Sequence, residues 1–67
     1  MTLEEFAPWL KSELERKGMS QAQLAEEAGI SRNAVNKYIH GEMLPTFYVF
    51  MCILDALGMK MWLQDDV

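Results

Sequence analysis

Residues 20–41 read SQAQLAEEAGISRNAVNKYIHG, and this stretch predicts two short helices joined by a glycine turn. Ser20 and Gln23 have the spacing of a capping box, in which each side chain bonds a backbone N–H group of the other residue. Gly29 follows the first helix of the pair and is a natural stop. The apolar face of this helix consists of Leu24, Ala25 and Ala28.

The second helix of the pair begins after Ser31, a good N-cap, and ends before Gly41. Its apolar residues are Val35, Tyr38 and Ile39. Two short helices joined by a glycine turn present the second one as a rod that fits the major groove of DNA. The positive N-terminal end of this rod would then point toward the DNA, where backbone amides can meet a phosphate.

A further helix is predicted on the N-terminal side of this pair. Thr2 and Glu5 again have capping-box spacing, and Gly18 is the stop. Pro8 is discordant, because a proline inside a helix deletes one backbone hydrogen bond. The helix therefore either kinks at Pro8 or starts near Ala7. Its apolar residues at helical spacing are Leu3, Phe6, Ala7, Leu10 and Leu14.

On the C-terminal side, Pro45 and Thr46 open a fourth helix that runs to Leu57 before Gly58. Between Phe47 and Leu57 only Asp55 is charged, whereas a surface helix would show a polar stripe. Three other short helices can hardly cover such a helix, so we expect part of it in a subunit interface. The alternative is an ordinary core helix.

The stretch from Ser20 to Gly41 resembles the helix-turn-helix of the Cro and lambda-repressor-like family, often called the XRE family. Ala25 matches the small residue at which the two helices cross closely, and Gly29 matches the tight turn. The resemblance covers roughly residues 3–58. It implies an all-α fold of four to five short helices and a DNA-binding function. The matching positions are Gln21, Ala25, Gly29, Ile30, Val35, Tyr38, Pro45, Leu57 and Gly58.

The candidate DNA contacts lie mainly on the outer face of the second helix of the pair. Arg32 can pair bidentately with guanine, and Asn33 or Asn36 can do so with adenine. Lys37 could reach a base or a phosphate. Without the motif around them, such polar residues are usually just a solvated surface. With the resemblance, the predicted contacts are Gln21, Ser31, Arg32, Asn33, Asn36, Lys37 and His40.

Two of these residues are assigned by the resemblance to the phosphate backbone. Gln21 stands at the start of the preceding helix, at the position whose side chain contacts the phosphate backbone in members of the family. His40 stands where the family often has asparagine just before the glycine, and histidine there could make the contact pH-dependent.

The charge is unevenly distributed along the 67 residues, whose formal net charge is -4. The locally basic stretch is 30–43, where Arg32 and Lys37 face one acid, Glu42. An acidic protein lacks the broad basic surface of a non-specific nucleic-acid binder. We therefore expect modest affinity with few phosphate contacts and a weak dependence on salt.

Residues 59–67 form a C-terminal segment after the domain at 1–58. In residues 59–64, Met59, Met61 and Leu63 alternate with Lys60, Trp62 and Gln64. This alternation is typical of a strand, although a short fifth helix is the alternative. A lone strand needs a partner, so it would pair with its copy in a homodimer and require a pseudo-palindromic operator. This resembles antitoxin-type members of the family. The predicted dimer contacts are Met59, Met61, Trp62 and Leu63.

The leading function is therefore a sequence-specific regulator of transcription, with double-stranded DNA as partner and repression as the expected mode. The alternative is an antitoxin or anti-regulator that acts mainly by binding a toxin or other protein. No catalytic residue, metal or cofactor is predicted, and Cys52 reads as a small core residue. The single cysteine and the lack of a signal or membrane segment favour the cytoplasm.

Overall fold

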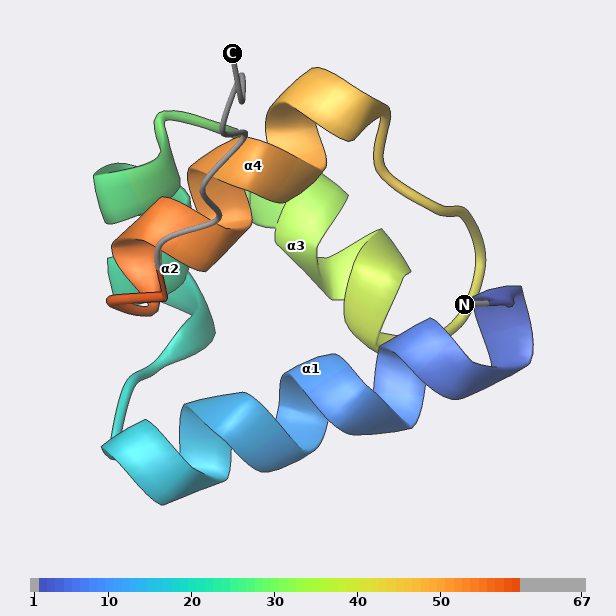
Figure 1. The fold of residues 1–67 in the computed structure, drawn as a ribbon, viewed down its shortest axis with the longest axis horizontal. Coiled ribbons are helices and arrows are strands. Elements are labelled where there is room, and N and C mark those ends of the chain that lie inside the picture. The colour runs from blue at the N-terminus through green and yellow to red at the C-terminus, as the bar shows by residue number, and fades with distance from the viewer. Residues whose placement is uncertain (1, 60–67) are drawn as a thin grey trace, which may run out of the picture.

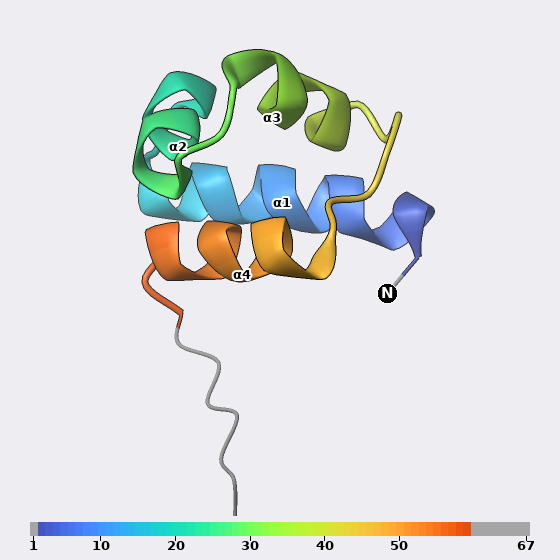
Figure 2. The same cartoon turned by 90° about the horizontal axis from the view of Figure 1, so that it is seen from above.

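The computed structural model describes residues 2–59, and four α-helices make up most of them. One long helix lies along one edge of the molecule, and the three shorter helices lie together on the opposite side of the molecule (Figure 1). In the perpendicular view, the second and third helices lie on one side and the fourth on the other (Figure 2). No strand occurs in residues 2–59, and the predicted all-α class is confirmed. The helices are α1 (Leu3–Lys17), α2 (Gln21–Ala28), α3 (Arg32–Ile39) and α4 (Phe47–Ala56).

Each helix begins at the capping residue that the sequence predicts. In α1 the Thr2 hydroxyl accepts a hydrogen bond from the Glu5 N–H at 3.2 Å, and the Glu5 carboxylate accepts one from the Thr2 N–H at 2.9 Å. The alternative prediction, that the helix starts near Ala7, is therefore wrong. Pro8 is exposed, and so is Glu4, whose carbonyl would have bonded the missing N–H. Water can satisfy that carbonyl, so the helix continues through the proline.

Two glycines make the turns on either side of α3. Gly29 has a φ of 73°, and the next N–H, that of Ile30, bonds the Ala25 carbonyl at 3.0 Å. Gly41 has a φ of 71°, and the Glu42 N–H bonds the Lys37 carbonyl at 2.9 Å. A side chain is strained at such left-handed positions, so glycine allows α3 to begin and end abruptly.

The hydrophobic core joins all four helices around the Phe6 side chain. Phe6 is 1% exposed, and its ring lies edge-on to Tyr38 of α3 at 6.2 Å between centroids. The Phe50 ring of α4 lies 5.9 Å from it on another side. The buried core residues are Phe6, Leu10, Leu14, Leu24, Ala25, Ala28, Val35, Tyr38, Ile53 and Leu57.

The two halves of α4 differ in how well this chain covers them. Ile53 and Leu54 are buried, as expected of a core helix. At the N-terminal end, Phe47 is 63% exposed and Tyr48 is 76% exposed. The core-helix interpretation therefore describes the C-terminal half of α4, while residues 2–59 leave two aromatic side chains at its N-terminal end uncovered.

The end of the described chain is Met59, one of the predicted dimer contacts. It is half-buried against the core, and its N–H bonds the Leu54 carbonyl at 2.8 Å. Met61, Trp62 and Leu63 lie outside the described residues, as does the choice between a strand and a fifth helix. Within residues 2–59, no helix has the length and apolar character needed to cross a membrane.

Candidate nucleic-acid interface

The helix α3 is held rigidly by its cap and by two buried side chains. The Ser31 hydroxyl accepts a hydrogen bond from the Ala34 N–H at 3.0 Å. Val35 and Tyr38 are 0% and 5% exposed, and they anchor the inner face of α3 between α1 and α2. Because the inner face is packed, the side chains on the opposite face are presented to solvent in a defined orientation.

That outer face carries most of the predicted contact residues. Arg32, Asn33 and Asn36 are exposed, whereas Lys37 is half-buried at the edge of the face. Arg32 and Asn36 are four residues apart, so their side chains are neighbours on one turn of α3. Two amides and a guanidinium on one helix face are groups that can recognise base edges in a major groove.

The C-terminal end of α3 carries His40, which is exposed. Its Nδ1 atom lies 2.8 Å from the backbone carbonyl oxygen of Asn36. Since a carbonyl oxygen can only accept, Nδ1 carries the proton and donates it in this bond. The ring is thereby fixed against the helix end.

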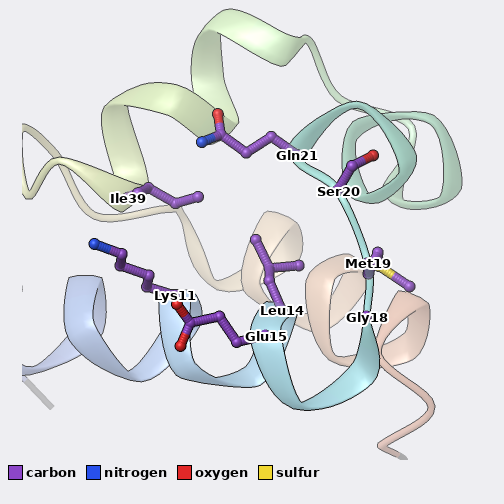
Figure 3. Close-up of a pocket in the computed structure, with 8 residues that line it drawn as sticks. All are labelled: Lys11, Leu14, Glu15, Gly18, Met19, Ser20, Gln21 and Ile39. Atoms are coloured by element: carbon purple, nitrogen blue, oxygen red, sulfur yellow. The ribbon is translucent and has the colours of Figure 1, made fainter.

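Gln21 lies on the first turn of α2, beside α3. Its backbone position is set by Ser20, whose hydroxyl accepts from the Gln23 N–H at 3.0 Å. The side chain is half-buried and points toward α3 (Figure 3). The structure therefore brings Gln21 close to the helix that carries the other predicted contacts, although it belongs to a different element.

Exposed acidic side chains follow α3 in the chain and also lie on the neighbouring helix α2, as the charge count leads one to expect. Glu42 is exposed directly after α3. Glu26 and Glu27 are exposed on α2, on the side opposite its buried residues. These carboxylates oppose the positive charge of Arg32 and Lys37, and they limit the attraction to a polyanion.

One basic residue that the sequence analysis missed lies beside this surface. Lys11 of α1 lines the same hollow as Gln21 and Ile39 (Figure 3). In the sequence it belongs to residues 1–29, which are acidic in sum, so counting charge by segments hides it. Only the packing of α1 against α3 shows the proximity.

Within residues 2–59, no group of three or more His, Cys, Asp or Glu side chains is placed to hold a metal ion. Cys52 is half-buried on α4.

Comparison with known proteins adds one finding. The family model described as helix-turn-helix matches residues 10–61, a range that contains α2, α3, α4 and more than half of α1. Neither the curated proteins nor the solved structures give a match to this chain.

Proposed function

This chain belongs to the Cro and lambda-repressor-like helix-turn-helix family of DNA-binding transcriptional regulators, and we propose that it is a dimeric, sequence-specific repressor. In this proposal, Ser31 caps the inserted helix, and residues 31–40 enter the major groove. The observation that carries it is the exposed face of α3, where Arg32, Asn33 and Asn36 lie opposite the buried Val35 and Tyr38.

The side chains have separate roles in this proposal. Arg32, Asn33 and Asn36 read base edges, while Lys37 binds a base or a phosphate. Gln21 and His40 bind the phosphate backbone. A repressor needs nothing more than occupancy of a promoter, so a single small domain is sufficient. Such a protein, encoded by a bacterium, a phage or another mobile element, would act where the DNA is, in the cytoplasm.

The homodimer is supported by exposed apolar surface and by the C-terminal pattern. Phe47 and Tyr48 are largely exposed on α4, and the sequence of residues 59–64 alternates like a strand that needs a partner. We propose that residues 1–58 form the DNA-binding domain and that residues 59–67 join two copies. Two-fold symmetry then requires half-sites about 34 Å apart.

The test is selection from a random duplex library, followed by fluorescence anisotropy on the enriched sequence. We expect a palindrome, with Arg32→Ala and Asn36→Ala each weakening binding by roughly 5- to 150-fold, the equivalent of about 1–3 kcal/mol for one base-pairing side chain. Arg16→Ala is the matched control, because Arg16 is an exposed arginine that bonds Glu13 on α1 at 2.6 Å. Equal effects of Arg32→Ala and Arg16→Ala would contradict the proposal.

A second candidate function is favoured by the same exposed aromatics. The protein would then be an antitoxin or anti-regulator that binds a partner protein through the N-terminal end of α4, around Phe47 and Tyr48. Failure of the library to enrich any duplex, with the helices intact by circular dichroism, would favour this function over DNA recognition.

A further inference from the structure

The open hollow between α1, α2 and α3 has an apolar floor and a polar rim. Leu14, Met19 and Ile39 supply apolar groups, and Gly18 belongs to the turn that borders it. Lys11 reaches in from α1 and Gln21 from α2, so that their polar ends lie on either side of Ile39 (Figure 3). The rim residues with polar side chains are Lys11, Glu15, Ser20 and Gln21.

This hollow adjoins the exposed face of α3. Ile39 is seven residues after Arg32 and three after Asn36, so all three side chains share one stripe of the helix. The hollow begins where this stripe ends. A ligand strand that follows the Arg32–Asn36 stripe toward the C-terminal end of α3 would pass over Gln21 and Ile39, and would therefore meet Lys11.

The charge at the rim determines which ligand suits it. Lys11 is exposed, and in the described part of the chain no carboxylate lies within 4.0 Å of its ammonium group. Its four-carbon stem can lie along apolar surface while the ammonium stays in water. When a helix occupies the major groove, a phosphate backbone runs along each side of it, and a compact ammonium binds phosphate well.

We propose that Lys11 of α1 contacts a backbone phosphate beside Gln21, so that the nucleic-acid interface extends beyond α2 and α3. The inference rests on the proposed DNA-binding function and adds a residue to it. Because a phosphate is the same at every base pair, Lys11 contributes affinity that is independent of base sequence. Glu15 follows one turn later on α1 and shares the rim, so its carboxylate weakens the attraction of the phosphate to Lys11.

The test is the salt dependence of binding, because each neutralised phosphate contributes about 0.9 to the slope of log K against log salt concentration. Anisotropy with the selected duplex is measured across a salt series for four proteins. They are the full chain and the variants Lys11→Gln, Lys17→Gln and Glu15→Gln. Lys17→Gln is the matched control, because the Lys17 ammonium lies beside Gly58, 3.6 Å from where a Cβ on that glycine would be.

We expect Lys11→Gln to make the slope shallower by about 0.9 and to weaken binding equally for matched and mismatched duplexes. Lys17→Gln should leave the slope unchanged, and Glu15→Gln should tighten binding. If Lys11→Gln and Lys17→Gln have the same slope as the full chain, the proposal is overturned while DNA binding stands. If the full chain itself binds no duplex, the proposed function fails instead.

Discussion

At the scale of single residues, the bond between His40 and the Asn36 carbonyl determines what His40 can bind. With Nδ1 donating at 2.8 Å, the free Nε2 atom of a neutral ring is an acceptor. A phosphate oxygen is also an acceptor, so the neutral ring cannot form a hydrogen bond to it. The protonated ring has a second N–H group and a positive charge, and it can.

We therefore predict that a side chain with a free donor can replace His40 and that one without a donor cannot. His40→Asn, whose amide N–H can donate, should keep the affinity for the selected duplex. His40→Ala should weaken binding by about tenfold, because a hydrogen bond to a charged group contributes roughly 1.5 kcal/mol or more. Anisotropy at constant ionic strength measures both variants. Equal affinities of His40→Asn and His40→Ala would show that residue 40 does not bind a phosphate.

At the scale of the elements, the first turn of α1 has a titratable cap. The Glu5 carboxylate accepts hydrogen bonds from Thr2, chiefly from its backbone N–H, and these bonds lower the pKa of Glu5 below its ordinary value of 4.5. A lowered pKa in the folded state means that the charged form is favoured by folding. This contribution to stability is complete above pH 4.5 and is lost as the pH falls through the lower pKa of the folded state.

Glu5→Gln should therefore lower the urea midpoint at pH 7, and the difference from the original protein should shrink toward zero in acid. Glutamine can still accept the Thr2 N–H, so the variant isolates the charge. Glu4→Gln is the control, because it removes a charge from the same turn but not from the capping bond. A midpoint difference for Glu5→Gln that is the same at pH 7 and at pH 3 would contradict this account.

The helix ends could be predicted from the sequence because short-range chemistry determines them. Thr2, Ser20, Ser31 and Thr46 each bond an N–H group three residues later, and such bonds depend on spacing alone. The sequence does not determine where α1 starts, because Pro8 opposes the cap at Thr2, and only the exposure of Pro8 resolves the conflict. The outer face of α3 was predictable from periodicity for the same local reason.

The position of Lys11 beside Gln21 could not be predicted in this way. The two residues belong to different helices, and their proximity results from how α1, α2 and α3 pack. The exposure of Phe47 and Tyr48 was expected only in general terms. The apolar pattern is similar along the whole of α4. Periodicity therefore cannot predict which end of the helix is buried by the rest of the same chain.

At the scale of the whole molecule, the chain is small and its core is correspondingly limited. A domain of about 60 residues buries only roughly 60% of its unfolded surface, so association between copies would add substantially to stability. The described residues leave Phe47 and Tyr48 exposed on α4, while Met59 at its far end packs against the core. The C-terminal segment therefore starts from an anchored residue.

We predict that removing residues 59–67 converts the proposed dimer to a monomer. The melting temperature of the full chain should rise with protein concentration, whereas that of the shortened chain should not. Removing only residues 65–67 is the control, since it keeps the predicted contacts at Met61, Trp62 and Leu63. Analytical ultracentrifugation gives the mass, and circular dichroism shows whether the helices remain. A stable dimer of residues 1–58 would rule out the segment as the subunit contact.

The Phe6 side chain packs between three helices, and this packing has a consequence for the spacing of the half-sites in the operator. Its ring contacts Tyr38 of α3 and Phe50 of α4, with centroids 6.2 Å and 5.9 Å away. In a dimer joined through α4 and the residues after it, the packing around this ring would set the separation of the two α3 helices. The number of base pairs between half-sites would then depend on side-chain volume in the protein interior. A change at residue 6 could alter which operators are bound while every base-reading side chain stays the same.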